Sequence, residues 1–167
     1  MRVIGIDCGG EYTGFGVVEE SESGVLTCVD VGAIKLSPRE PLETRLNTIF
    51  KRLCATIETH RPDVVAIEDV FYAANAKSAL KLGHIRGVAM LAAAHCGLAV
   101  AAYAPLAIKS AVVGYGKAEK FQVQVMVARL LRLDAPPEPA DAADALAIAI
   151  CHIHTAATLL RQHATVR

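Results

Sequence analysis

The chain has 167 residues, of which 53% are hydrophobic, 20% charged and 5% aromatic. This content suits one compact domain over residues 1–167, with about the last eight residues expected to form a flexible tail. The composition excludes disordered, collagen-like and low-complexity chains. The 17 basic and 17 acidic side chains give a formal net charge of +0, which argues against a nucleic-acid partner held by bulk charge.

Three apolar runs open the chain and predict a three-stranded antiparallel meander. They are residues 2–7, the run from Gly14, and the run that follows the turn at 21–24. Residues 41–60 carry apolar side chains at helical spacing, which predicts an amphipathic helix packed on the sheet. The β-branched run over residues 63–68 then predicts a buried strand.

Helices and strands continue to alternate in the rest of the chain, which indicates the α/β class. The expected elements are a helix over 76–95, a strand over 98–104, helical segments near 107–112 and 118–133, and a buried helix from residue 141. The apolar stretch from Gly87 to Ile108 has the length of a membrane span, about 20 residues. Gly97 and Pro105 interrupt it, so we expect a buried helix and strand there and no membrane partner.

The cysteines and the beginning of the chain indicate a reducing compartment. Five cysteines are an odd number, lie far apart and include no Cys-x-x-Cys pair, which argues against a disulfide framework and against structural zinc. They are Cys8, Cys28, Cys54, Cys96 and Cys151. A strand-like apolar run begins within two residues of Met1 and no basic segment precedes it, so we expect no export signal and a cytoplasmic location.

Four carboxylates stand where the predicted fold can bring them together. Asp7 and Glu68 each end an apolar strand-like run, and such strand ends line the ligand-binding crevice of open α/β sheets. Asp141 and Asp144 are three residues apart at the start of the last helix, hence on one face. Clustered carboxylates repel one another and raise each other's pKa values, so the cluster favours bound hard divalent cations. Two Mg²⁺ ions would balance its charge.

This arrangement suits phosphodiester hydrolysis, in which two metal ions activate a water, orient the scissile phosphate and stabilise the leaving oxygen. Each carboxylate also has an ordinary structural explanation. An aspartate after a strand commonly forms a turn, and two aspartates in a first helical turn commonly cap the helix and complement its dipole. Glu68 is harder to explain in this way, because a carboxylate that closes an apolar run is costly to bury without a partner.

Five segments, in order and over nearly the whole chain, resemble the RuvC family of bacterial Holliday-junction resolving endonucleases. They are GIDCGGEYTGFGVV (Gly5–Val18), RPDVVAIEDVF (Arg61–Phe71), NAKSALKLGHIRGVA (Asn75–Ala89), VVGYGKAEKFQVQ (Val112–Gln124) and ADAADALAIAI (Ala140–Ile150). An initial strand with Asp-x-Gly also occurs in actin-like kinases, but five segments in this order are specific to the family.

The resemblance implies a ribonuclease-H-like fold, an α/β structure with a mixed five-stranded sheet and helices on both faces. It implies that Asp7, Glu68, Asp141 and Asp144 form a catalytic tetrad that binds two Mg²⁺ ions, with Mn²⁺ as a substitute. It also implies a homodimer that makes paired nicks across a four-way DNA junction, leaving 5′-phosphate and 3′-hydroxyl ends. The implied functional partners are the RuvA and RuvB branch-migration proteins.

One position beside the first carboxylate departs from the family. The family usually has Asp-Pro-Gly where this chain has Asp7-Cys8-Gly9. Losing the proline frees a backbone N–H and slightly loosens the turn that orients Asp7, and we expect catalysis to survive. Cys8 is favoured as a small, half-buried packing residue over a soft metal contact or a redox-sensitive thiol.

The neutral total charge hides a basic central segment. Residues 75–132 carry eight basic side chains and one acidic one, whereas residues 1–74 carry seven and twelve. The candidate DNA contacts in the basic segment are Lys77, Lys81, Arg86, Lys109, Lys117 and Lys120. A solvated helix face explains Lys77 and Lys81 about as well. Lys109 and Lys120 are favoured because they match basic positions of the family that contact DNA near the scissile phosphate.

Phe71 and Tyr72 follow Glu68 by three and four residues, at the mouth of the expected site. An exposed ring there would stack on an unpaired base at the junction centre, although core packing is an equally common fate of such side chains. The resemblance supports the stacking role for Phe71 and less clearly for Tyr72.

Two other functions are alternatives. A nucleotide-binding protein of the actin-like superfold shares the first hairpin, but that fold needs two such halves and 167 residues hold one. A catalytically silent junction-binding protein would bind the same DNA without metal-dependent nicking, and retention of all four carboxylates argues against it.

Overall fold

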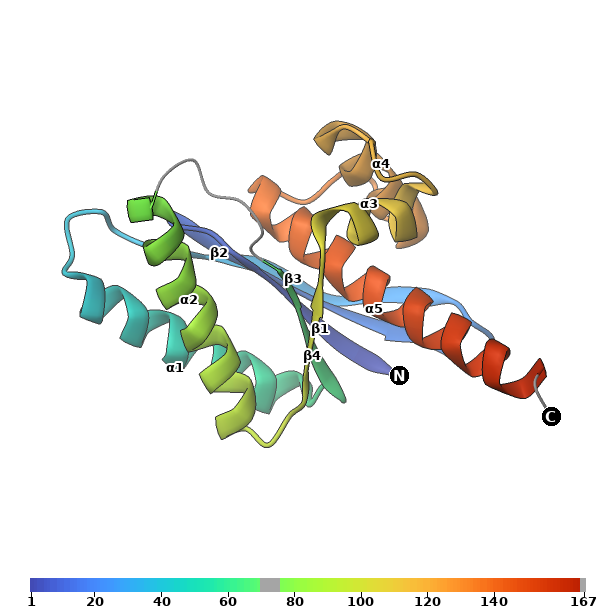
Figure 1. Ribbon diagram of the computed structural model, residues 1–167, viewed down its shortest axis with the longest axis horizontal. Helices are drawn as coiled ribbons and strands as arrows, with labels where there is room; N and C mark the ends of the chain where they lie inside the picture. Colours follow the sequence, from blue (N-terminus) through green and yellow to red (C-terminus); the bar gives the residue numbers. More distant parts are fainter. Residues whose placement is uncertain (70–75, 166–167) are drawn as a thin grey trace.

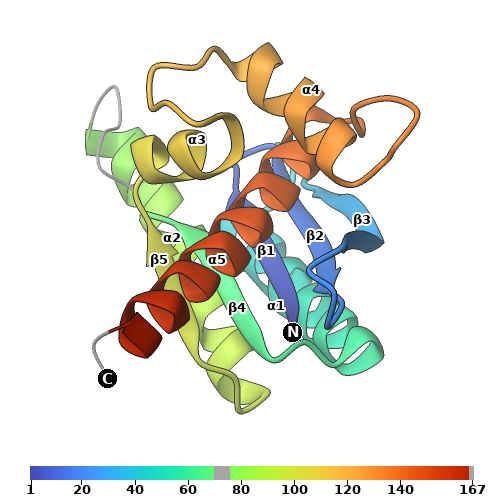
Figure 2. The same ribbon diagram turned by 90° about the vertical axis from the view of Figure 1, so that its right-hand side faces the viewer.

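The computed structural model describes the backbone of residues 1–69 and 76–165, and the side chains of these residues as far as 159. Within this part of the chain, one sheet is covered by helices on both faces (Figures 1 and 2). The strands are β1 (Arg2–Cys8), β2 (Tyr12–Glu20), β3 (Leu26–Lys35), β4 (Val64–Glu68) and β5 (Val100–Tyr103). The helices are α1 (Leu42–His60), α2 (Ala76–His95), α3 (Pro105–Val113), α4 (Lys120–Leu130) and α5 (Ala140–Thr165).

The sheet is mixed and has the strand order β3-β2-β1-β4-β5. β1, β2 and β3 pair antiparallel in chain order, which confirms the predicted meander. β4 pairs parallel with β1, and β5 pairs parallel with β4. The predicted α/β class and five-stranded mixed sheet are therefore confirmed.

The observed elements begin and end close to the predicted ones. The helix expected over 41–60 is α1. Pro41 precedes it, and the residue that follows it, Arg61, has a left-handed φ of 46°. The apolar stretch over residues 87–108, which has the length of a membrane span, contains the end of α2, all of β5 and the beginning of α3. The backbone of α5 stays helical to Thr165, beyond the point near residue 160 where the sequence predicts a flexible tail.

The two faces of the sheet carry different side chains, because successive residues of a strand point to opposite sides. In β1, Ile4 and Ile6 are fully buried in the core shared with α1 and α2. Val3 belongs to the second core, which α3, α4 and α5 cover (Figure 1). By this alternation Gly5 and Asp7 share the face of Val3, so the first carboxylate lies on the α5 side of the sheet.

Helix α5 lies directly against β1 and β2 because glycines face it. A Cβ atom on Gly5 would overlap the carbonyl group of Ala145 and lie 2.7 Å from the Ala149 nitrogen. A Cβ atom on Gly14 would overlap the backbone of Asp141 in the same way. Larger side chains at these positions would push the helix, and the aspartates of its first turns, away from the sheet.

Helix α5 is also the one helix in the described part of the chain that is long and apolar enough to cross a membrane, over Ala140–Leu159. Its apolar side chains are used in the protein core. Leu146, Ile148, Ile150 and Ile153 are at most 2% exposed, packed against the sheet and the other helices of this face. The hydropathy of α5 is therefore that of a central core helix.

The substitution Gly5→Ala should lower the free energy of unfolding by at least about 2 kcal/mol, because the added carbon forces α5 away from β1. Urea unfolding followed by circular dichroism measures the change. Gly10→Ala is the matched control, since its added carbon would meet only the flexible end of Lys81, and it should change the stability by less than about 0.5 kcal/mol. Equal stability of the two variants would contradict the close packing of α5.

Candidate active site

Asp7 and Glu68 lie side by side at the carboxyl edge of the parallel strands. β1 and β4 pair with Ile6 opposite Ile67, and each strand has its carboxylate one residue further on. Because side chains alternate along a strand, both carboxylates leave the face of the isoleucines and point to the α5 side. Two hydrophobic strands thus place two acidic groups on the same side of the sheet.

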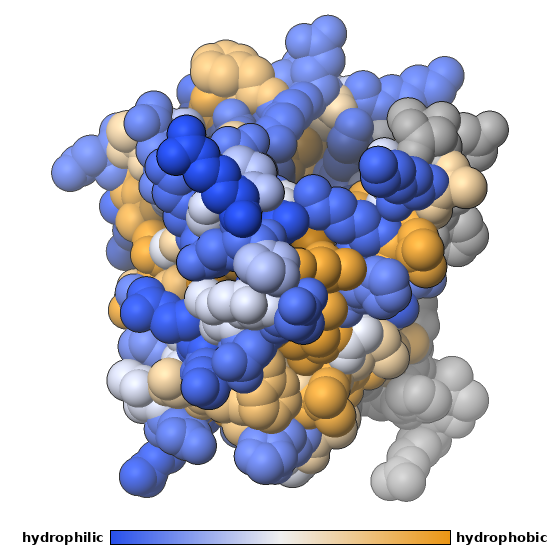
Figure 3. Space-filling view, turned by 90° about the vertical axis from the view of Figure 1, so that its left-hand side faces the viewer, coloured by the Kyte–Doolittle hydropathy of each residue, from blue (hydrophilic) through white to orange (hydrophobic). Residues whose placement is uncertain are grey.

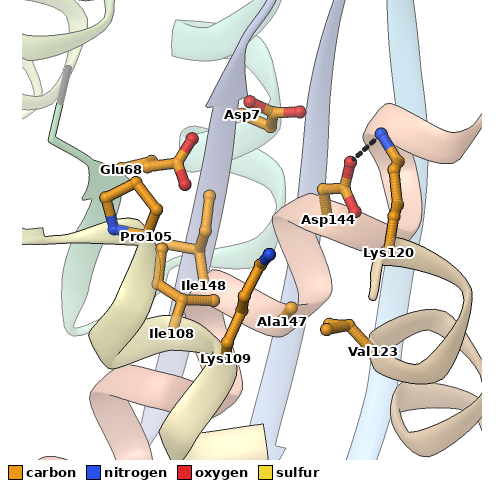
Figure 4. A pocket seen from close by; sticks show the side chains of 10 residues that line it. All are labelled: Asp7, Glu68, Pro105, Ile108, Lys109, Lys120, Val123, Asp144, Ala147 and Ile148. Atoms are coloured by element: carbon orange, nitrogen blue, oxygen red, sulfur yellow. Dashed lines mark ion pairs between the residues drawn. The ribbon is translucent and has the colours of Figure 1, made fainter. Parts of the chain in front are cut away.

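The first turns of α5 bring two aspartates to the same edge. The contact between Gly14 and the backbone of Asp141 anchors this end of the helix on β2. Asp144, almost one turn further on, enters the same space and points toward Lys120 (Figure 4). The carboxylate of Asp141 lies instead beside Gly9, in the turn after β1.

Three of the carboxylates share a cavity of about 200 Å³. Figure 4 shows Asp7, Glu68 and Asp144 entering it from different elements, with Lys109 of α3 and Lys120 of α4 directed toward them. The lining residues are Asp7, Glu68, Pro105, Ile108, Lys109, Lys120, Val123, Asp144, Ala147 and Ile148. The cavity therefore combines three acidic and two basic groups with apolar walls.

Asp7 has a strongly raised pKa. Burial raises the pKa of Asp7 from its usual 3.8 to about 7, and the negative charges of Asp144 and Glu68 add to the effect. Asp141 acts in the same direction, whereas the nearby Lys120 ammonium lowers this pKa. At neutral pH the Asp7 carboxyl is thus close to half protonated, because the lysines alone do not neutralise the site.

The two lysines partly neutralise the other carboxylates. The Lys120 ammonium lies 2.5 Å from Asp144 Oδ2 (Figure 4). Burial raises the pKa of Asp144, while the hydrogen bond and charge of Lys120 counteract the rise. Burial and the charge of Asp144 also raise the pKa of Glu68, against the lowering effect of Lys109 and Lys120. Burial lowers the pKa of Lys120, but the hydrogen bond to Asp144 and the charge of that carboxylate outweigh the effect of burial, so the pKa of Lys120 is raised.

The chemistry of the cavity fits a hard divalent cation. Its acidic ligands are carboxylate oxygens, which Mg²⁺ and Mn²⁺ prefer, and a cation would relieve the repulsion that raises the pKa of Asp7. Among the described residues, however, no three Asp, Glu, His or Cys side chains stand close enough to hold one ion in this arrangement. Lys120 is paired with Asp144, and Asp141 lies at the edge of the cavity. A cation at Asp144 would have to replace the Lys120 ammonium.

The charges of the other three predicted carboxylates all raise the pKa of Asp7, so the four groups lie within electrostatic reach of one another, and their catalytic role stays a prediction. The structure brings Asp7, Glu68 and Asp144 to the cavity and leaves Asp141 beside Gly9. The three-residue spacing puts Asp141 and Asp144 on one side of the helix, and the charge of Asp141 adds to the rise in the pKa of Asp144.

Two of the predicted DNA-binding lysines belong to the cavity, and a third lies near its edge. Lys109 and Lys120 are part of the lining. The ammonium of Lys81 lies beside Gly10, in the turn between β1 and β2. Gly9, in the same turn, lies beside Asp141. Lys109 and Lys120 thus face the carboxylates from α3 and α4, whereas Lys81 reaches the turn after β1 from α2.

The remaining predicted contacts are less informative. Lys77 and Lys117 are exposed, at the beginning of α2 and in the turn before α4. Phe71 and Tyr72 lie outside the described residues, so their stacking role stays a prediction.

Arg86 holds the end of β4. Its Nε donates a hydrogen bond to the carbonyl oxygen of Glu68 at 3.3 Å, and its Nη2 lies 3.0 Å from the Asp69 carboxylate. The guanidinium therefore fixes the backbone that carries Glu68, a positioning role that differs from the predicted phosphate contact. The DNA contact of Arg86 stays a prediction.

Arg45 supports the site and is not among the residues predicted for it. Its buried guanidinium donates a hydrogen bond to the carbonyl oxygen of Gly10 and so holds the turn after Asp7. Arg45 shares a helical face with the buried residues Ile49 and Leu53. A lone arginine at this spacing is a signal in the sequence, since a buried charged group requires a polar partner.

Comparison with known proteins decides the family. The family model of the crossover junction endodeoxyribonuclease RuvC matches residues 3–152. The chain belongs to the RuvC family. A relative of this description from Koribacter versatilis is 71% identical over 98% of this chain and 99% of its own length. Another, from Acidobacterium capsulatum, is 56% identical over 97% and 98%.

Solved structures agree with this assignment. Thermus thermophilus RuvC in complex with a Holliday junction substrate superimposes with a TM-score of 0.87 at 34% identity, covering 95% of this chain and 96% of that one. The yeast mitochondrial Holliday junction resolvase Ydc2 superimposes with a TM-score of 0.70 at 16% identity, covering 95% of this chain and 80% of that one, and supports the fold alone. The predicted ribonuclease-H-like fold is confirmed.

Membership of the RuvC family establishes the activity. The chain is an endonuclease that resolves Holliday junctions in DNA recombination and repair, and its hydrolysis depends on a divalent metal ion. The nucleotide-binding and catalytically silent alternatives are not favoured.

Cys8, where the RuvC family usually has proline, faces away from the carboxylates. It packs against the core between the sheet and the helices α1 and α2, because adjacent residues of a strand point to opposite faces. Burial raises the pKa of the Cys8 thiol from its usual 9.0 to about 12, and the charge of Asp7 adds to this rise. A protonated thiol on this face acts as a packing residue, the role favoured from the sequence.

The substitution Asp7→Asn should stabilise the metal-free protein at pH 8 and should stabilise it less at pH 5. The pKa of Asp7 in the folded state, about 7, lies above the unfolded value of 3.8. The folded state therefore holds the additional proton between these pH values and loses stability as the pH rises through them. At pH 8 the neutral amide avoids this cost, which is on the order of 2–4 kcal/mol. Urea unfolding in EDTA at both pH values measures the difference.

The matched control is Glu22→Gln, which changes an exposed carboxylate in the turn between β2 and β3. Its effect should be the same at both pH values. Adding Mg²⁺ at pH 8 should stabilise the unmutated protein more than the Asp7→Asn variant, because a bound cation neutralises the carboxylates. A stability difference that is independent of pH would contradict the charge crowding at Asp7.

Proposed function

We propose that Asp7, Glu68, Asp141 and Asp144 are the metal-binding catalytic carboxylates with which this RuvC-family endonuclease resolves Holliday junctions. The proposal is carried by the meeting of carboxylates from β1, β4 and α5 in one cavity, where the pKa of Asp7 is raised to about 7. Turn formation and helix capping explain single aspartates, but they do not explain why three half-buried acidic groups from separate elements share one cavity. Perturbed carboxylates of this kind cluster at functional sites.

The cavity would hold two Mg²⁺ ions, with Mn²⁺ as a substitute. Asp7, Glu68 and Asp144 would bind them from the lining, and Asp141 from the edge. When bound, two such ions activate a water, orient the scissile phosphate and stabilise the leaving oxygen. The proposed products are nicks with 5′-phosphate and 3′-hydroxyl ends.

The chain's own cations prepare the cavity for a phosphodiester. Lys109 and Lys120 enter the same space as the carboxylates, where their ammonium groups attract phosphate oxygens. Lys120 is paired with Asp144, so neutralisation of that carboxylate releases the ammonium for the DNA backbone. The apolar walls, which include Ile108 and Val123, exclude bulk water and strengthen these charge interactions.

We further infer that the chain forms a homodimer through the outer face of α2. The inner face of this helix packs in the core, but Leu80 and Leu91 are 63% and 59% exposed. Cβ atoms on Gly83 and Gly87 would meet nothing within 4 Å, so a second helix can approach closely there. Figure 3 shows hydrophobic side chains grouped on this side of the molecule. Two-fold pairing of such a face gives the two active sites that paired nicks require.

The proposed setting is the bacterial cytoplasm, where the dimer would act on four-way DNA junctions together with the RuvA and RuvB branch-migration proteins. Membership of the RuvC family supports these partners.

The substitutions Asp7→Asn and Glu68→Gln should each reduce cleavage of a synthetic four-way junction at least about 1,000-fold, because each removes a ligand charge from the site. Junction affinity should stay within about threefold of the unmutated protein, since the bulk of affinity comes from phosphate contacts. Denaturing gels measure the nicks and fluorescence anisotropy measures the binding. Glu22→Gln should leave both unchanged. Normal cleavage by either carboxylate variant, with or without normal binding, would contradict the assignment of these catalytic roles.

The substitution Lys120→Ala should weaken junction binding and flatten its salt dependence by about one unit of the log–log slope, the effect of losing one phosphate contact. Anisotropy titrations across a KCl series in Mg²⁺ measure the slope. Lys51→Ala, at an exposed position of α1 on the other side of the sheet, should leave the slope unchanged. An unaltered slope and cleavage rate for Lys120→Ala would contradict the phosphate contact and leave Lys120 as an ordinary surface residue.

A further inference from the structure

Two exposed aromatic rings stand at the corner formed by α3, the following turn and the start of α4, the helix whose first residue, Lys120, lines the cavity. Phe121 is 70% exposed and Tyr115 is 48% exposed. Phe121 directly follows Lys120, whose ammonium reaches Asp144 in the cavity. An aromatic side chain in water at such a place suggests a partner that covers it during function.

Hydrogen bonds join the turn that carries Tyr115 to the start of α4, which carries Phe121. Glu119 and Gln122 form a reciprocal capping box at the start of α4. The Tyr115 hydroxyl donates a hydrogen bond to Gln122 Oε1 at 3.0 Å, and the same oxygen accepts the backbone N–H of Glu119 at 2.8 Å. Phe121 also forms one wall of an open hollow of about 210 Å³, lined by Val113, Phe121, Gln122, Val125, Met126 and Arg129. A ring held in this way loses little freedom when a partner packs on it.

The charge of the corner identifies the class of partner. Residues 105–130 carry four basic side chains and one acidic one. Lys109 and Lys120 enter the cavity, and Lys117 is exposed in the turn before α4. A second copy of this corner would repel the first, whereas a polyanion with flat aromatic groups matches both the charge and the rings.

We propose that Phe121 packs its ring on a nucleotide of the strand that crosses the cavity, with Tyr115 as a second contact. The inference rests on the proposed function, since it takes the scissile phosphate to lie at Asp7. Stacking on a base tolerates any sequence, because every base has a π-face. Phe121 is therefore a positioning residue that holds the strand in register with the carboxylates, and it does not select the cleaved sequence.

The test compares Phe121→Ala, Phe121→Leu and Phe121→Trp on a four-way junction, in an Asp7→Asn background that prevents cleavage. Junction affinity should fall about tenfold with alanine and with leucine, and tryptophan should retain it, because the contact needs a flat ring. A 2-aminopurine base next to the scissile phosphate should be quenched on binding to the phenylalanine and tryptophan proteins only. Leu159→Ala, at a 51% exposed position at the far end of α5, is the control for trimming an exposed apolar side chain and should bind normally.

Equal affinity and equal 2-aminopurine signals for all four residues at position 121 would overturn the contact alone. A sedimentation coefficient that falls to the monomer value in Phe121→Ala would also overturn it, because the ring would then serve a second copy of the chain. Absence of junction binding by the protein that retains Phe121 would overturn the proposed function together with this contact.

Discussion

The active site depends on how closely α5 lies against the sheet. Gly5 and Gly14 leave room for little more than the backbone of the helix, and this contact keeps Asp144 within electrostatic reach of Asp7. Asp144 stands on a 26-residue helix whose apolar face fills the core. Its position is therefore set by core packing, which is more rigid than a loop.

This packing forces acidic groups together, and the protein moderates the resulting repulsion in two ways. Near neutral pH a proton is shared between Asp7 and solvent, since the pKa of Asp7 is about 7. Lys120 pairs with Asp144 at the surface of the cavity. A proton and a flexible lysine can both be exchanged without disturbing the core, so the site can accept cations while the fold stays unchanged. The repulsion among these carboxylates lowers the stability of the fold, as is common at functional sites, where activity requires groups that destabilise the structure.

The fold and the main carboxylates are predictable from the sequence because they follow from periodicity. Asp7 and Glu68 end apolar runs, and parallel pairing places such ends together. The alternation of side chains along a strand also assigns Cys8 to the opposite face from Asp7. What periodicity cannot supply is the direction of a long or branched side chain between elements distant in sequence. The inward turn of Arg86 and the placement of Asp141 beside Gly9 depend on such distances.

The zero net charge of the chain reflects an arrangement around the cavity. Acidic groups come from β1, β4 and α5, and basic groups come from α3 and α4. A phosphodiester approaching the carboxylates alone would be repelled, so DNA and divalent cations must enter such a site as linked ligands, each lowering the cost of binding the other. In the proposed site Lys120 would carry this linkage, because one ammonium cannot neutralise Asp144 and bind a phosphate with full strength at the same time. With the proposed roles, this ion pair would make the affinity for DNA depend on whether divalent cations are bound.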